Sequence, residues 1–398
     1  MTGLSRRRTV LLTLGRLPKS IELIRGFSAL GFRVLVAEPH PWHLSRVSRQ
    51  VSRSVEVVSP VTDTAGYLRQ LGELVTQERV DLVVPISEET MHAAGLKPLL
   101  PSGVTMFCPD QRTLLELHDK LRFIELARPT GVDVPETVAL GDPQARRLAD
   151  AGDFVVKPRF SCSGRGVEFF PRGAPLPVRD EPCVVQAKVE GAVLSTFSVV
   201  RGGQVLVTVV YRGLVMAGTV SVCFEQVDCP AISQWVERFA AARQHDGFLS
   251  FDFVVDAGGR PFGIECNPRI TSGVHFVEPG DLATAMISAP GQASPVRLRP
   301  QRLAQQFYPT LTETERAFLA GDFAQARRSF AAMWRARDVV WSWRDPLPFL
   351  TMPLTAWRIL SHAIRKRTSL GEASTFDIEW YGSPPEAAGP AARVEVSP

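Results

Sequence analysis

Short apolar runs alternate with amphipathic segments through the first hundred residues of the chain. The apolar runs are long enough for buried strands and lie at residues 9–14, 33–37, 55–58 and 82–86. Between them, residues 19–30 and 64–79 carry apolar side chains at helical spacing, with Ile21, Ile24 and Phe27 near one face of the first segment. Strands that alternate with helices in this way predict an α/β fold with a parallel, Rossmann-like sheet over residues 1–110.

The loop after the first apolar run does not carry the glycine pattern of a dinucleotide site. A single glycine, Gly15, stands where that pattern needs three spaced glycines, so the sequence does not predict NAD binding. Arg16 and Lys19 occupy this loop, at the carboxyl end of a parallel sheet, where ligands often bind. They are candidates for holding an anionic substrate, and a solvated loop is the alternative.

The pattern changes after residue 110. An amphipathic helix is expected from about Gln111, followed by strands bounded by prolines and glycine turns, which predicts an α+β domain over residues 111–300. Helical stretches at 312–320 and 323–334 and a basic amphipathic segment at 354–367 predict a helical extension over residues 301–382. Residues 383–398 are rich in Pro and Ala and are predicted to form a disordered tail.

Composition excludes several classes of protein. The 398 residues hold 45 Lys and Arg against 41 Asp and Glu, an excess too small to indicate nucleic-acid binding. The six cysteines form no CxxC pair and no zinc-type spacing with histidine, so they are expected to be buried thiols in a reducing, cytoplasmic compartment. No apolar run reaches the roughly 18 residues of a membrane span.

One C-terminal segment leaves a second interpretation open. Apolar Trp357, Ile359, Leu360 and Ile364 are interleaved with basic Arg358, Arg365, Lys366 and Arg367. This pattern suits contact with a membrane surface, and it equally suits a helix that packs on the protein with its basic side in water.

Candidate chemistry is concentrated in the stretch GIECNPRITSGVHF, residues 263–276. On an extended strand Glu265, Asn267 and Arg269 project from one face, because alternate side chains share a face. A carboxylate, an amide oxygen and a fixed cation suit a magnesium-bound polyphosphate. The alternative is an ordinary half-buried strand with its polar side in solvent.

A second group of residues lies about a hundred positions earlier. Lys157 ends the apolar strand 154–158, and a small loop containing Ser161, Gly164 and Gly166 follows. Backbone amides of such a loop can bind phosphates while a lysine neutralises their charge. The alternatives are that Lys157 is simply solvated and that the loop is an ordinary turn.

Five separated elements occur in the order of one known family. Lys120, Lys157 with its loop, residues 186–191, Asp252 in SFDFVVD and the ECNPR strand resemble the ATP-grasp family over about residues 110–280. The resemblance implies an ATP-grasp fold and use of ATP with Mg²⁺ or Mn²⁺. It also implies an ADP-forming ligase that phosphorylates a small carboxylate or enol and joins it to an amine or amino acid, forming a C–N bond.

The resemblance also implies a role for each matching residue. Lys120 and Lys157 would contact the phosphates, and Lys157 and Arg269 would act in catalysis, Arg269 by holding the acyl phosphate or the oxyanion formed from it. The loop closing over the phosphates would comprise Ser161, Ser163, Gly164 and Gly166. Adenine would meet the hinge residues Gln186, Ala187 and Val189, with Glu190 at the ribose, and the metal would be held by Asp252, Glu265 and Asn267. This chain has Ala187 and Val193 where family hinges usually carry acids.

The residues also predict how the acidic side chains meet. Asp252 lies thirteen positions before Glu265, and Gly258 and Gly259 stand between them. A hairpin of two antiparallel strands would bring both carboxylates to one metal site.

Other residues have two interpretations. His275 could shape the acceptor pocket or deprotonate the amine, or it could be a packed, hydrogen-bonded histidine. Tyr211, Arg212 and Glu225 could border the pocket or lie on the strand surface. Cys162 and Cys266 are expected to be structural, since this chemistry needs no nucleophilic thiol.

A finer resemblance concerns the segments GRLPKSIELIRGFSALGFRVLVAEPH, QWVERF and DPLPFL. They are similar to the ATP-grasp ligases that join 4-deoxygadusol to glycine in mycosporine biosynthesis, and equally to other ATP-grasp ligases of actinobacterial type, so the substrates stay open. The other function class left open is an ATP-binding protein without catalysis, or one that sits on a membrane surface. The joint presence of three metal-ligating residues favours the enzyme, and a homodimer is left open.

Overall fold

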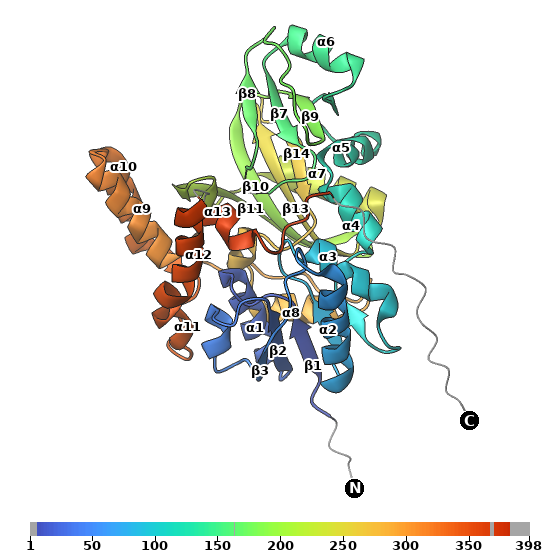
Figure 1. Ribbon diagram of the computed structural model, residues 1–398, viewed down its shortest axis with the longest axis vertical. Coiled ribbons are helices and arrows are strands. Elements are labelled where there is room, and N and C mark those ends of the chain that lie inside the picture. Colours follow the sequence, from blue (N-terminus) through green and yellow to red (C-terminus); the bar gives the residue numbers. More distant parts are fainter. Residues whose placement is uncertain (1–5, 163, 367–369, 383–398) are drawn as a thin grey trace.

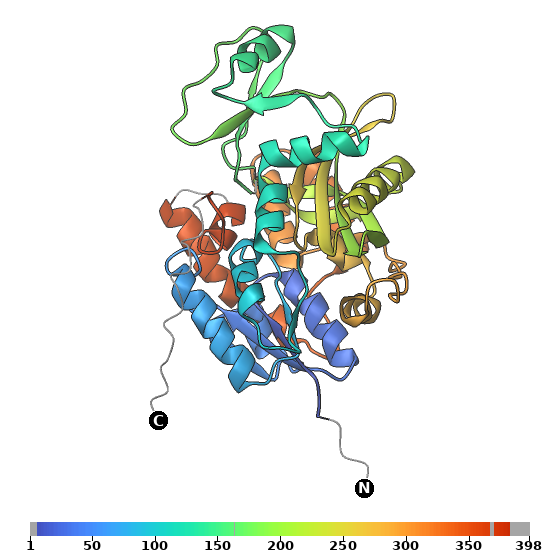
Figure 2. The same ribbon diagram turned by 90° about the vertical axis from the view of Figure 1, so that its right-hand side faces the viewer.

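The computed structural model describes residues 6–162, 164–366 and 370–382. Three sheets organise this part of the chain (Figure 1). A parallel sheet lies at one end of the molecule, a large mixed sheet occupies the middle, and a small antiparallel sheet lies at the other end (Figures 1 and 2).

The N-terminal sheet is parallel, with strand order β3-β2-β1-β4-β5. Its strands are β1 (Thr9–Leu12), β2 (Arg33–Glu38), β3 (Arg53–Glu56), β4 (Leu82–Val84) and β5 (Thr105–Met106), connected in part by α1 (Pro18–Ala29), α2 (Thr64–Gln77) and α3 (Thr90–Ala93). The predicted Rossmann-like sheet is confirmed. The third strand begins and ends two residues before the expected 55–58, because Arg53 is the residue that pairs with Leu35 of β2.

The helix expected from Gln111 is two helices, α4 (Gln111–His118) and α5 (Lys120–Ala127). Asp119 breaks the expected single helix, because its backbone is extended and its carboxylate accepts hydrogen bonds from the amides of Leu121 and Arg122. An aspartate in this position starts a new helix at the next residue. The break makes Lys120 the first residue of α5.

The small sheet is antiparallel, with order β6-β9-β7-β8. It consists of β6 (Thr137–Ala139), β7 (Phe154–Pro158), β8 (Glu168–Phe170) and β9 (Cys183–Ala187), and α6 (Pro143–Ala151) packs against it. Lys157 therefore projects from a central strand of this sheet, next to the glycine loop that connects β7 to β8.

The middle sheet has the order β14-β13-β10-β11-β12-β15-β16. Its strands are β10 (Ala192–Arg201), β11 (Gln204–Ala217), β12 (Val220–Gln226), β13 (Gly247–Val255), β14 (Pro261–Asn267), β15 (Leu303–Gln305) and β16 (Arg337–Asp338). Helix α7 (Pro230–Arg243) covers part of it through Trp235 and Phe239, and α8 (Pro279–Ile287) packs on α1 of the N-terminal domain.

The segment after residue 300 is mainly helical, as predicted. It comprises α9 (Phe307–Leu319), α10 (Phe323–Arg335), α11 (Leu347–Leu350), α12 (Met352–Lys366) and α13 (Leu370–Thr375), and it also supplies the two short strands β15 and β16. Helices α9 and α10 form a hairpin that projects from the molecule (Figure 1). The domain boundaries expected from the sequence remain predictions.

Some predictions for the C-terminal part of the chain concern residues that the structure does not describe. The predicted disordered tail, residues 383–398, lies outside the described residues, as does Arg367. The side chains of Arg358, Leu360, Ile364 and Lys366 are likewise not described. None of the described helices is both long and apolar enough to span a membrane.

The end of the described chain returns to the N-terminal sheet. In this return segment, residues 373–382, Asp377 accepts hydrogen bonds from Arg16 at 2.6 and 3.0 Å, and Arg16 also donates to Glu38 at 2.7 Å. Ile378 and Trp380 are buried among apolar side chains of the N-terminal domain. Because two carboxylates already satisfy its guanidinium, Arg16 is not a free anion-binding side chain, and that expectation is wrong.

Glu22 of α1 forms a second buried connection. Its carboxylate is fully buried and meets His275 Nδ1 at 3.1 Å, Arg299 at 2.7 Å and Arg337 at 3.5 Å. Burial acts to raise the pKa of Glu22, but His275 and the two arginines lower it overall, to about 2. Glu22 therefore holds α1 to segments nearly three hundred residues further along the chain.

We predict that Glu22→Ala lowers the free energy of unfolding by about 3 to 5 kcal/mol, because it removes a fully buried carboxylate and leaves His275 and two half-buried arginines without their partner. Glu73→Ala, at an exposed position of α2, is the matched control and should change stability little. Since the folded pKa lies below the ordinary value of 4.5, the contribution of Glu22 is complete above that pH and is lost as the pH falls toward 2. Urea unfolding followed by circular dichroism measures both effects, and equal stability of the two variants would contradict the assignment.

Candidate active site

A cavity of about 1180 Å³ opens between the three sheets. Its walls come from loops of the N-terminal domain, from β7 and β9 of the small sheet, from β10 to β14 of the middle sheet, and from α9, α12 and α13. Eleven of the predicted site residues line it, which are Lys157, Ser161, Gly164, Gln186, Ala187, Val189, Glu190, Asp252, Glu265, Asn267 and Arg269. Lys120 does not line the cavity, but it contacts Ser161 and Glu265 of this set.

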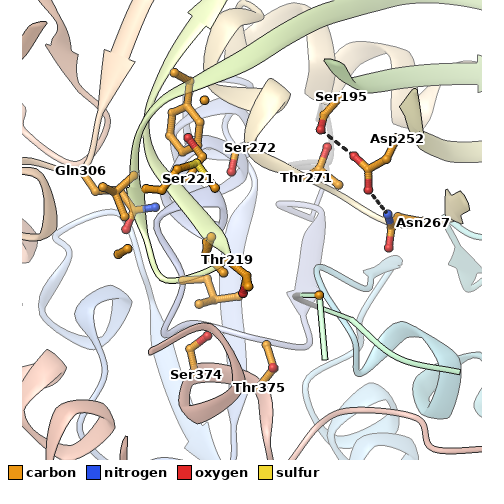
Figure 3. A pocket seen from close by; sticks show the side chains of 18 of the residues that line it. Ser195, Thr219, Ser221, Asp252, Asn267, Thr271, Ser272, Gln306, Ser374 and Thr375 are labelled. Atoms are coloured by element: carbon orange, nitrogen blue, oxygen red, sulfur yellow. Dashed lines mark hydrogen bonds between the residues drawn. The ribbon is translucent and has the colours of Figure 1, made fainter. Parts of the chain in front are cut away.

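The predicted hairpin is confirmed. Asp252 of β13 lies directly opposite Glu265 of β14, and the turn between the strands contains Gly258 and Gly259. The Asn267 amide donates to Asp252 at 3.3 Å and to Glu265 at 3.4 Å, and Ser195 donates to Asp252 at 2.5 Å (Figure 3). Two carboxylates and one amide therefore face the cavity from neighbouring strands.

The two carboxylates differ in their tendency to ionise. Burial, and then the neighbouring Glu265, raise the pKa of Asp252 to about 7. Burial also acts to raise the pKa of Glu265, but Lys120 and Lys157 lower it overall. The two carboxylates therefore shift in opposite directions, as expected when like charges lie close together and the nearby cations favour ionisation of one of them.

Both predicted lysines lie beside this acidic pair. Lys120 donates to the carbonyl and hydroxyl oxygens of Ser161 at 2.8 and 3.1 Å, and its Nζ is 3.6 Å from Glu265. Lys157 donates to the carbonyl of Ile264 at 3.0 Å, and burial lowers the pKa of its ammonium to about 8. Both side chains are almost fully buried, so their charge acts on the cavity and little on bulk solvent.

The glycine loop curves over the cavity next to these lysines. Gly164 and Gly166 have φ values of +72° and +68°, a conformation that glycine adopts without strain. A Cβ atom at Gly164 would lie 3.1 Å from Thr219, in the turn between β11 and β12, so the loop lies close to that turn. Ser163 lies outside the described residues, and Gly166 is in the loop but does not line the cavity.

Side chains of the return segment hold the loop from the other side. The Cys162 thiol donates to the buried Glu379 carboxylate at 2.9 Å, and the Arg165 guanidinium lies 5.3 Å from the ring centre of Tyr381. Burial raises the pKa of the Cys162 thiol well above its usual value, and the nearby Glu88 and Glu379 add to this. A thiol in this state is not a nucleophile, as expected for a structural cysteine.

The predicted hinge forms the opposite wall. Gln186 is buried and donates to Thr137 at 2.9 Å, and the amides of Ala187 and Lys188 bond to the carbonyls of Glu136 and Asp153 at 2.8 and 3.0 Å. Within the described residues, the Val189 amide has no protein acceptor. Glu190 is exposed at the cavity edge and forms an ion pair with Lys188.

The sequence interpretation missed an acidic residue that faces Arg269. Glu88, which follows β4, is almost fully buried and forms an ion pair with Arg269. The Arg269 guanidinium also donates to Asn267 at 3.0 Å, which connects it to the acidic pair. Among the described residues, Oε2 of Glu88 and Nε of Arg269 are buried without a hydrogen-bond partner. The polar residues Ser87 and Glu88 directly after a buried strand were the available signal.

Lys19 lies in the cavity next to this pair. Its ammonium donates to Ser87 Oγ and to the carbonyl of Ile270, both at 2.8 Å. Burial lowers the pKa of Lys19 to about 7 and Arg269 acts in the same direction, while Glu89 and Glu88 oppose the shift. Lys19 therefore remains a candidate for contact with an anionic substrate, unlike Arg16.

The remaining candidates divide between the cavity and its surroundings. His275 lines the cavity but is buried and bonded to Glu22, in agreement with the packed, hydrogen-bonded interpretation. Tyr211 and Arg212 line the cavity and Glu225 does not. Five of the six cysteines are buried, as predicted, and Cys229 is half-buried.

Comparisons with known proteins agree with this architecture. A family model described as an ATP-grasp domain matches residues 117–273, and this part of the chain has the ATP-grasp fold. No curated protein matches the sequence. The finer resemblance to ligases that act on 4-deoxygadusol remains a prediction.

Solved structures with the same fold include carboxylating enzymes. The biotin carboxylase domain of Hydrogenobacter thermophilus 2-oxoglutarate carboxylase, a dimer with magnesium ADP and bicarbonate, has a TM-score of 0.59 at 15% identity, covering 74% of this chain and 73% of that one. Staphylococcus aureus N5-carboxyaminoimidazole synthetase with ADP has a TM-score of 0.57 at 15% identity, over 75% and 82%. Campylobacter jejuni biotin carboxylase in a β-γ-ATP complex has a TM-score of 0.58 at 14% identity, over 74% of each chain. At these identities the likeness establishes the fold alone.

We predict that Lys19 titrates near pH 7 in the folded protein, while Lys188, whose pKa the partner Glu190 raises, titrates above its usual 10.5. An amine-acylating reagent applied across pH 6 to 10, with modification read by peptide mass spectrometry, should give a midpoint near 7 at Lys19. Lys188 in the same samples is the control. A Lys19 midpoint close to 10 would contradict the described environment.

Proposed function

We propose that the chain is an ADP-forming ligase that uses ATP and Mg²⁺ to phosphorylate a carboxylate, or an enol, and couples it to an amine. The observation that carries the proposal is the joint placement of Asp252, Glu265 and Asn267 beside Lys157 and Arg269 in one cavity. Hard oxygen ligands and fixed cations together are what phosphoryl transfer needs, because positioning and charge neutralisation supply most of its catalysis.

The nucleotide is proposed to lie between the hinge and the glycine loop. Adenine would meet the free amide of Val189, with Glu190 within reach of the ribose. The phosphates would extend toward Lys157, Lys120 and the amides of residues 161–166. Positive φ at Gly164 and Gly166 suits such a loop, because glycine adopts this conformation without strain and lets the backbone approach phosphates closely.

The residues present fit a magnesium ion. Asp252, Glu265 and Asn267 would hold it, and their oxygens are the ligands that hard divalent cations prefer. The raised pKa of Asp252 is caused by burial and by the neighbouring Glu265, and a cation bound between these two half-buried carboxylates would compensate their charge. When bound, magnesium would neutralise the charge on the transferred phosphoryl group. The proposed site combines only two carboxylates with an amide, and the described part of the chain holds no group of three or more His, Cys, Asp or Glu side chains that could bind a metal ion.

The proposed reaction has two steps. An oxygen of the carboxylate attacks the γ-phosphorus of ATP and the bond to ADP breaks, which leaves an acyl phosphate. The amine nitrogen then attacks the carbonyl carbon, the bond to phosphate breaks, and a proton leaves the nitrogen to give an amide. Arg269 is positioned to stabilise negative charge in both steps, and Glu88 orients its guanidinium.

We predict that Glu265→Gln lowers acceptor-dependent ADP release at least a hundredfold with the fold intact, because the change removes a metal-ligating charge from the site. Glu225→Gln is the matched control, since it makes the same substitution on β12 outside the cavity. Circular dichroism checks that both variants fold, and a coupled assay measures ADP. Normal ATP consumption by Glu265→Gln would contradict the metal assignment.

Substrates are sought by incubating the protein with ATP and magnesium against a matrix of acids and amines that includes 4-deoxygadusol with glycine. ADP release that requires both partners and yields a condensed product, identified by mass spectrometry, would support the ligase. Magnesium-dependent ATP binding without ADP release across the matrix would favour the alternative of an ATP-binding protein without catalysis.

A further inference from the structure

Part of the cavity is not used by the proposed phosphoryl transfer. Beyond Thr271 and Ser272 it continues between the β11–β12 hairpin and the helices α9 and α12. We call this part the apolar chamber, and its principal lining residues are Met216, Val222, Tyr308, Met352, Ala356 and Trp357. In Figure 3 the acidic site, with Asp252 and Asn267, lies on one side of the view, and Ser221 and Gln306, at the start of the chamber, lie on the other.

The size of the cavity indicates room for a second ligand of substantial size. Its volume of about 1180 Å³ exceeds the roughly 300–1,000 Å³ of a site for one drug-sized ligand. The nucleotide is proposed to occupy the part between hinge and glycine loop, so the chamber is left for the body of a substrate whose reacting group lies at Arg269.

The walls of the chamber favour an apolar ligand over a charged one. Trp357 is 63% exposed and Met216 is 46% exposed, so large apolar groups face open space next to the site. The ionisable groups at its edges that the structure describes already have partners, with Arg212 paired to Glu225 at 2.6 Å and Glu313 to Arg316 at 3.6 Å. A charged substrate body would find no free counter-ion there, whereas an apolar one would be removed from water.

Two cationic side chains lie at the inner end of the chamber. Arg269 and Lys19 lie where the chamber meets the acidic site, and both contact the backbone at Ile270. An acid would therefore bind with its carboxylate at these cations and the rest of the molecule directed toward α12. This orientation puts the carboxylate beside the position proposed for the γ-phosphate.

We propose that the acceptor is a carboxylic acid with a large, uncharged and mainly apolar body, and that the apolar chamber selects it. The inference rests on the proposed ligase function and adds the substrate class to it. Each methylene group buried in the chamber should strengthen binding about fourfold until the chamber is filled.

The test uses the full chain with ATP, magnesium and hydroxylamine, which replaces the unknown amine and traps an acyl phosphate as a hydroxamate. The acids are a straight-chain series from acetate to decanoate together with phenyl-substituted acids. We expect kcat/KM for ADP release to rise steadily with the size of the apolar body. Isothermal titration calorimetry of decanoate in the presence of ADP and magnesium measures binding independently of turnover.

Two variants of α12 make the test specific. Ala356→Trp fills the chamber from an exposed helix position and should lower kcat/KM and affinity for decanoate at least tenfold more than those for acetate. Leu354→Trp adds the same ring on the same helix outside the cavity lining and should change neither.

The outcomes separate the two proposals. ADP release that is independent of acid size, or equal loss in both variants, would overturn the substrate class and leave the ligase function standing. Decanoate binding that Ala356→Trp weakens, without ADP release from any acid, would support the chamber and contradict the ligase. Absence of both binding and turnover across the series would overturn the chamber proposal.

Discussion

Three buried carboxylates of the N-terminal domain, Glu22, Glu38 and Glu88, each form an ion pair, and these pairs determine how the rest of the chain packs on that domain. Glu22 meets Arg299 and Arg337, and Glu38 holds Arg16 for Asp377 of the return segment. Glu88 meets Arg269 of the ATP-grasp domain. An unpaired charge at any of these positions would cost several kcal/mol, so few alternative arrangements of the domains are compatible with the sequence. The cavity is a consequence of that arrangement.

The same constraint prepares the cavity for an anionic ligand. Lys120, Lys157 and Arg269 lie beside the Asp252–Glu265 pair and Lys19 lies beside Glu88, and burial lowers the pKa of Lys157 and Lys19. A lysine whose ammonium is destabilised by burial gains strongly from a phosphate, because the phosphate supplies the counter-charge that water no longer provides. The two carboxylates of the acidic pair repel each other, so a bound metal ion would stabilise them. Magnesium and a polyphosphate satisfy both sets of groups together.

The sequence predicts those features that depend on local spacing. Alternating strands and helices indicated the Rossmann-like sheet, and the thirteen-residue spacing with two glycines indicated the hairpin that joins Asp252 to Glu265. The break at Asp119 was missed because one capping side chain decides it within an otherwise continuous apolar pattern. Contacts between distant segments leave no periodic pattern in the sequence, so they could not be predicted from it. Arg16 and Asp377 are 361 positions apart, so the loop of the first strand was interpreted as a substrate-binding candidate when its arginine is a structural ion-pair partner.

The return segment connects the glycine loop to the N-terminal sheet. Asp377 is held by Arg16, Trp380 packs against His92 with ring centres 5.0 Å apart, and Glu379, between them, accepts from Cys162 of the loop. Displacement of the loop would leave the buried Glu379 carboxylate without its thiol donor, which costs free energy because a buried charge needs its hydrogen bonds. The position of the loop over the proposed phosphate site therefore depends on residues more than two hundred positions away. The C-terminal extension is for this reason part of the site, and Ser374 and Thr375 line the same cavity as the acidic pair (Figure 3).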